Sequence, residues 1–136
     1  MSTIRTFSLL AAATAMSAAT LAVSPALAHS SDDDDDRETI RTGQCTGSTD
    51  WKLKAKSDDG GIEVEAEIDS NRTGQAWRWV IRHNGSVSAR GTSVTTGRSG
   101  SFDVERRMTD LSGTDRFVLR ATNPASGETC RGVLAW

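Results

Sequence analysis

Strict alternation of apolar and charged residues is the feature that most constrains the fold of this chain. In the segment WKLKAK, residues 51–56, Trp51, Leu53 and Ala55 share one side and three lysines share the other. After a glycine-containing turn, IEVEAEI, residues 62–68, alternates apolar residues with three glutamates. A period of two over this length is typical of a strand with one buried face. The two segments therefore predict an antiparallel hairpin.

One register of this hairpin satisfies both of its faces. When Lys56 lies opposite Glu63, every lysine faces a glutamate, and Ala55 faces Val64 on the apolar side. A hydrophobic pattern of this kind specifies the register of a strand pair. Opposite charges across two strands add only about 0.2 to 1 kcal/mol each. The charged side is therefore interpreted as a solvated sheet face and not as a binding surface.

A second hairpin is predicted in WRWVIRHNGSVSARG, residues 77–91, around the Asn-Gly pair at 84–85. A two-residue loop would place Ile81 opposite Ser88. A three-residue loop ending in a left-handed glycine would place Ile81 opposite Val87. Because the second register matches apolar side chains, it is the one expected.

Three more alternating segments, SFDVER, RFVLRAT and TCRGVLAW, follow, separated by turn-forming residues. No helical period is sustained in residues 44–136. Seven short strands in about 90 residues predict an all-β chain folded as a β-sandwich of about seven antiparallel strands with Greek-key connections. Residues 44–136 are expected to form this single domain.

Two cysteines, Cys45 and Cys130, lie near the two ends of the expected domain. Thiols of an exported protein oxidise. Closing a loop of about 85 residues is worth up to roughly 4.6 kcal/mol in the chain-entropy model. We therefore expect one disulfide between them, because reactive thiol pairs usually lie close together in sequence.

The N-terminal region predicts export. Residues 1–28 combine Arg5, an uncharged apolar run and a small-x-small end at 26–28, as signal peptides do. Residues 29–43 include five consecutive aspartates, Asp32–Asp36, and are expected to form a disordered acidic tether. We expect a secreted, extracellular monomer with no membrane span after cleavage.

The charge balance suggests few classes of partner. From Arg37 onward the chain has 15 lysines and arginines against 13 acidic residues. This small excess does not indicate nucleic acid, which usually needs a concentrated basic face. The expected partner is an extracellular molecule of unknown identity.

Two resemblances refine the fold. DRFVLRATNPASGE, residues 115–128, resembles the penultimate strand and following turn of immunoglobulin-like domains, although Phe117 stands where those domains have a tyrosine. Residues 43–136 also resemble a group of small secreted actinobacterial proteins without an assigned function, through a G-x-C-x-G start, W-K-L-K, H-N-G and G-E-x-C. The resemblance implies an immunoglobulin-like β-sandwich and no particular activity.

The sequence contains no nucleophile elbow and no metal-binding His-Glu-x-x-His motif, so an enzyme and a cofactor are not expected. A secreted binding or structural protein is the favoured function, and two alternatives stay open. His29, N-terminal after cleavage, and His83 are the candidate ligands of a copper site. Trp77 and Trp79, about 7 Å apart on one strand face, are a candidate sugar-stacking platform if they face solvent, although the core is the favoured location.

Overall fold

The computed structural model describes residues 37–136 and shows eight strands and no helix there. The expected signal peptide, His29 and the five aspartates lie outside the described residues. The strands are β1 Glu38–Gln44, β2 Asp50–Asp58, β3 Gly61–Asp69, β4 Ala76–His83, β5 Ser86–Val94, β6 Ser101–Thr109, β7 Arg116–Thr122 and β8 Thr129–Ala135. In this part of the chain no helix is long and apolar enough to cross a membrane.

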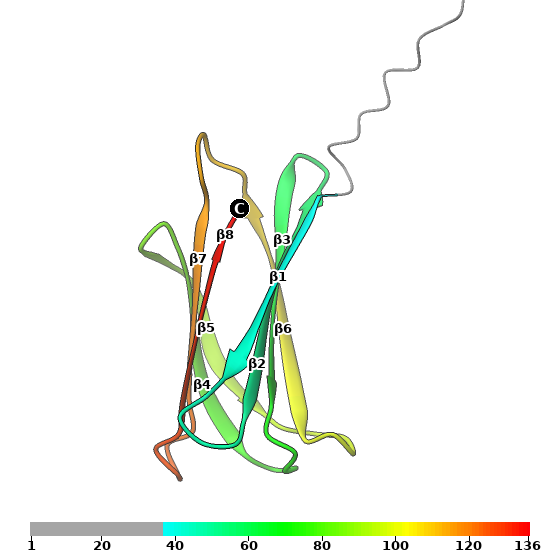
Figure 1. Cartoon of the computed structure of the whole chain (residues 1–136), viewed down its shortest axis with the longest axis vertical. Coiled ribbons are helices and arrows are strands. Elements are labelled where there is room, and N and C mark those ends of the chain that lie inside the picture. The colour runs from blue at the N-terminus through cyan, green and yellow to red at the C-terminus, as the bar shows by residue number, and fades with distance from the viewer. Residues whose placement is uncertain (1–36) are drawn as a thin grey trace, which may run out of the picture. The chain divides into compact units, whose positions relative to one another are not determined.

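The strands form two four-stranded antiparallel sheets packed face to face (Figure 1). The first sheet has the order β1-β2-β3-β6, and the second has the order β5-β4-β7-β8. The predicted all-β sandwich is therefore confirmed, with one strand more than expected.

The connectivity is immunoglobulin-like once β1 is set aside. Of the remaining seven strands, β2, β3 and β6 form one sheet. Strands β4, β7 and β8 lie together in the other sheet. The same division occurs in constant-type immunoglobulin domains, except that here the fourth strand, β5, belongs to the second sheet. Successive loops consequently gather at the two ends of the sandwich, where side chains from distant parts of the sequence can meet.

The core lies between the sheets and consists of the inward-facing residues of the alternating strands. Its largest fully buried side chains are Trp77 and Phe117. Other buried apolar members are Leu53, Ile62, Val64, Ile68, Trp79, Ile81, Phe102, Leu119 and Leu134. Burying a side chain of this size contributes about 1.5 to 3 kcal/mol. The alternation seen in the sequence is thus the alternation between core and surface.

The β2–β3 hairpin has the predicted register. Lys56 pairs with Glu63, and Ala55 pairs with Val64. Asp59 and Gly60, both with positive φ, form the turn. The prediction succeeded because the charged and the apolar faces required the same alignment.

The predicted register of the β4–β5 hairpin is wrong. Asn84 and Gly85 have φ values of 48° and 87° and form a two-residue turn, with His83 paired to Ser86. A bulge then shifts the register, so that Ile81 pairs with Ala89 in place of Val87. The extra residue in a bulge changes which side chains face each other, and matching of apolar residues across a regular ladder cannot account for it.

Strand β1 corrects the predicted extent of the acidic tether. Residues 38–43, expected to be disordered, belong to a strand that pairs with β2 along its whole length. Its one large apolar side chain, Ile40, is 44% exposed, so hydrophobic alternation gave no signal. Main-chain hydrogen bonds to the free edge of β2 hold this strand, starting with the Ser57 amide, which donates to the Arg37 carbonyl at 2.9 Å.

The predicted disulfide between Cys45 and Cys130 is confirmed, with Cα atoms 4.2 Å apart. Cys45 directly follows β1 and Cys130 lies in β8, so the bond joins the two sheets at one edge of the sandwich. Trp51 fills the space beside it. A Cβ atom on Gly132 would lie 2.6 Å from its ring. The absence of a side chain at Gly132 thus makes room for the indole of Trp51.

Candidate functional site

Six arginines share the outer face of the second sheet. Trp79, Ile81 and the other inward residues of these strands alternate with outward residues, and many of the outward ones are arginines. The six are Arg78 and Arg82 of β4, Arg90 of β5, Arg116 and Arg120 of β7, and Arg131 of β8, and all are exposed. We refer to this surface as the arginine face.

The pairing of the strands places two of these arginines side by side and a third in the same row. Arg120 pairs directly with Arg131, and Val80 separates Arg120 from Arg90 in the same row. Neighbouring strands lie about 4.8 Å apart and alternate residues about 6.7 Å apart. The arginines are therefore spread over four strands, and Arg120 and Arg131 are the pair in direct cross-strand contact.

No carboxylate balances these charges within the sheet. The sequences of β4, β5, β7 and β8 contain no aspartate or glutamate. Within residues 37–136 none of the six arginines forms an ion pair. Like charges directly opposite each other in a sheet are destabilising, so Arg120 and Arg131 repel each other. An anion bound between them would relieve this repulsion.

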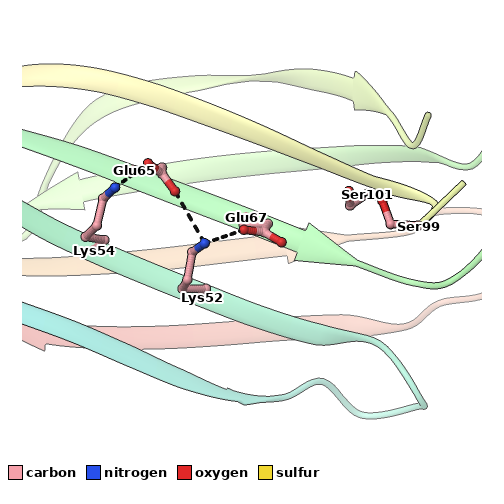
Figure 2. A network of polar contacts seen from close by, with 6 residues as sticks. All are labelled: Lys52, Lys54, Glu65, Glu67, Ser99 and Ser101. Carbon is pink, nitrogen blue, oxygen red and sulfur yellow. Dashed lines mark hydrogen bonds and ion pairs between the residues drawn. The ribbon is translucent and has the colours of Figure 1, made fainter. Parts of the chain in front are cut away.

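The outer face of the first sheet is different, because two of its lysines form ion pairs with glutamates of the neighbouring strand (Figure 2). Lys52 Nζ lies 2.5 Å from Glu67 Oε2, and Lys54 Nζ lies 2.6 Å from Glu65 Oε2. The hydrogen bond from Lys54 lowers the pKa of Glu65, and the hydrogen bond to Glu67 raises the pKa of Lys52. Lys52 and Lys54 thus form the cross-strand ion pairs that the predicted register implies.

Apolar residues lie among the arginines. A shallow pocket of about 400 Å³ is lined by Arg78, Val80, Arg82, Arg120, Thr122 and Pro124. Val118 is also outward-facing but only 8% exposed. The aliphatic stems of arginines commonly cover such surface while their charged groups stay in water. The face thus offers guanidinium donors above a partly apolar floor.

The two candidate platform residues lie in the core. Trp77 is 0% exposed and Trp79 is 4% exposed, so neither presents a ring face to a sugar. The indole nitrogen of Trp79 donates to Ser93 Oγ at 2.9 Å. The favoured core location is confirmed, and the stacking platform is excluded by the position of both rings.

His83, the candidate copper ligand, lies at the end of β4 and is largely buried. Its side chain is 11% exposed, and its Nε2 lies 2.5 Å from Asp115 Oδ1. Its ring packs on Phe117, with centroids 4.7 Å apart. The proposed partner His29 lies outside the described residues. Within residues 37–136 no group of three histidine, cysteine or acidic side chains is arranged to hold a metal ion.

No protein-family model, no curated protein and no solved structure matches this chain. Its function is therefore inferred from its own surfaces. The arginine face is not evident from the net charge of the domain, because the acidic residues of the first sheet offset the arginines of the second. A signal was present in RWVIR and RFVLR, where arginines four positions apart enclose inward-facing apolar residues.

Proposed function

We propose that this protein is a non-enzymatic binding module for linear polyanions and that the arginine face is its binding surface. The observation that carries the proposal is the presence of six exposed arginines on a sheet whose strands have no acidic residue. A surface of one sign raises the local concentration of oppositely charged ligands and speeds their association.

The chemistry of arginine favours oxyanions. Its planar guanidinium donates two parallel hydrogen bonds to phosphate, sulfate or carboxylate groups. On the arginine face, the pair Arg120 and Arg131 could share one oxyanion, and Arg90 lies farther along the same row. The ligand class is therefore a molecule with repeated oxyanion groups.

The layout of the face favours a polymer over a small anion. The arginines are spread over four strands, and the pocket among them is shallow, with only Val80 and Pro124 as apolar lining residues. A small anion would meet one or two guanidinium groups, whereas a chain can engage several at once and gain from multivalency. No tryptophan or phenylalanine lies on the outward side of β4 or β7. Recognition then depends on charge and spacing, since stacking on nucleobases needs exposed aromatic rings.

Export is part of the proposal. The disulfide fits an oxidising compartment, and the N-terminal sequence predicts a signal peptide. A polyanion met outside the cell is an anionic polysaccharide or a phosphate polymer.

Isothermal titration of the secreted protein with four polymers tests this function. Heparin, polyphosphate and polygalacturonate supply sulfate, phosphate and carboxylate groups, and dextran is the uncharged control. We expect saturable binding of at least one polyanion at 50 mM salt, weakening as salt rises, and no binding of dextran. Equal binding of dextran, or no binding of any polyanion at low salt, would contradict the proposal. Comparison of the three polyanions identifies the preferred oxyanion.

A further inference from the structure

Three loops form a polar pocket at one end of the sandwich, away from the arginine face. They connect β1 to β2, β3 to β4 and β7 to β8, at the bottom of Figure 1. The pocket has a volume of about 350 Å³, and its lining includes Gly47, Ser48, Arg72, Gln75 and Glu128. This volume is near the lower end of the range of small-molecule sites.

Glu128 provides a fixed negative group in this pocket. Its Oε1 accepts a hydrogen bond from the Thr49 amide at 2.9 Å. The side chain rests against Gly47, where a Cβ atom would lie only 2.6 Å from Oε1. Within residues 37–136 its second oxygen, Oε2, accepts no hydrogen bond. That oxygen is therefore available to a ligand.

Arg72 provides the opposite charge from another loop. Its carbonyl accepts hydrogen bonds from Ser70 Oγ at 3.1 Å and Thr95 Oγ1 at 2.5 Å, so its backbone is held in place. Its guanidinium forms no ion pair among the described residues, Glu128 included. The pocket therefore holds two opposite charges that do not neutralise each other.

The surrounding structure fixes the backbone of the loops that line the pocket. The disulfide of Cys45 and Cys130 closes the neighbouring edge. The Thr46 amide donates to the Thr129 carbonyl at 2.8 Å, which ties the β1–β2 loop to the start of β8. Gln75 Oε1 is buried and has no hydrogen-bond donor within the described residues. A pre-organised site of this kind loses little entropy when a ligand binds.

We propose that this pocket binds a small zwitterion of the amino-acid class, with the ligand carboxylate on Arg72 and its ammonium group on Glu128 Oε2. A sugar fits less well, because no aromatic side chain lines the pocket for stacking. A simple anion would meet the Glu128 carboxylate, and a simple cation would meet the Arg72 guanidinium. The inference is independent of polyanion binding.

Nuclear magnetic resonance titration of the secreted, disulfide-bonded protein tests the inference. The probes are alanine, acetate, methylammonium and glucose. We expect alanine to shift the amide signals of Gly47, Thr49 and Gly127 saturably, and acetate and methylammonium each to bind at least tenfold more weakly. Equal or tighter binding of acetate or glucose, or no saturation by alanine up to 50 mM, would overturn it.

Two variants assign the roles. Arg72→Gln and Glu128→Gln should each weaken alanine binding at least tenfold, while Arg98→Gln, which changes an exposed loop arginine outside the pocket, should leave it unchanged. If Glu128→Gln does not fold, Gly47→Ala displaces the same carboxylate and should weaken binding similarly. Retention of binding in a folded Glu128 or Gly47 variant would contradict the assignment.

Discussion

At the scale of single residues, Asp115 shows how this fold retains a buried charge. Its carboxylate is 0% exposed and accepts hydrogen bonds from His83, from Asn84 Nδ2 at 3.0 Å and from the Leu111 amide at 3.0 Å. Its own amide and carbonyl bond to Trp136. The residue thus joins the β4–β5 turn, the β6–β7 loop and the C-terminal end. In the sequence, Asp115 is distinguished only as the first residue of the segment that resembles immunoglobulin-like domains.

The hydrogen bonds outweigh the desolvation of Asp115. Burial raises the pKa of its carboxyl. The hydrogen bonds from His83, Leu111 and Asn84 lower the pKa by more than burial raises it, so the pKa lies below the ordinary value of 3.8. A carboxyl whose pKa is lower in the folded state stabilises the protein above its unfolded pKa. That contribution is lost as the pH falls below about 4 and through the folded pKa.

Replacing Asp115 with asparagine is expected to lower the free energy of unfolding at pH 7 by about 1 to 3 kcal/mol, because buried donors lose a charged acceptor. The stability of the variant should also fall less steeply than that of the native protein between pH 4 and pH 2. Urea unfolding at pH 7, 4 and 2.5 measures both effects. Parallel stability curves for the two proteins would contradict the lowered pKa.

At the scale of elements, the register of a strand pair was predicted correctly where its charged face and its apolar face required the same alignment. The register of β2 with β3 follows from charges on one side and apolar residues on the other. The register of β4 with β5 depends on a bulge, which the pattern of side chains does not predict. Strand β1 depends on main-chain bonds to β2, and its residues are mostly exposed. Local patterning predicts buried alternation but not the pairing of a polar edge strand.

Proline substitution tests the main-chain role of β1. Since Ser57 donates to Arg37, alternation of the ladder directs the amides of Thr39, Arg41 and Gly43 toward β2 and that of Thr42 away from it. Arg41→Pro should therefore lower the free energy of unfolding by at least about 1 kcal/mol more than Thr42→Pro, since an edge strand tolerates proline only where the amide faces solvent. Chemical denaturation of both variants makes the comparison, and equal losses would argue against the pairing of β1.

The two candidate sites were missed for the same reason. RWVIR and RFVLR show that β4 and β7 each direct two arginines outward, but only the sheet order places β4 and β7 side by side, with β5 and β8 on either side of them. Arg72 and Glu128 are 56 positions apart and meet only because their loops close the same end of the sandwich. The direction of a side chain can be inferred from the alternation along its strand. Which side chains from distant parts of the sequence meet depends on the order of the strands in the sheets.

At the scale of the whole molecule, charge is divided between the two faces of the sandwich. The strands of the first sheet carry nine acidic residues, and those of the second carry none. A net excess of two positive charges from Arg37 onward therefore hides a strongly basic surface. The charge total therefore does not predict the arginine face, on which the proposed binding of polyanions rests.

The five aspartates Asp32–Asp36 are expected to weaken polyanion binding. They are joined to the domain through Arg37, and their charge acts over a Debye length of roughly 10 Å at 0.1 M salt. Changing all five to serine should tighten the binding of polyphosphate several-fold at 50 mM salt, with a smaller effect at 500 mM. The melting temperature should stay within a degree or two. Equal affinities at low salt would show that the acidic run does not influence the face.

The most direct test of the arginine face is the salt dependence of polyphosphate binding in two variants of equal net charge. Arg120→Gln with Arg131→Gln removes a neighbouring pair from the face. Lys56→Gln with Arg98→Gln removes two exposed charges elsewhere. A plot of log affinity against log salt should become shallower by about 1.5 for the first variant, because two anion contacts are lost. It should keep the native slope for the second. Equal changes of slope in the two variants would show that net charge alone attracts the polymer and that the arginine face is not its binding site.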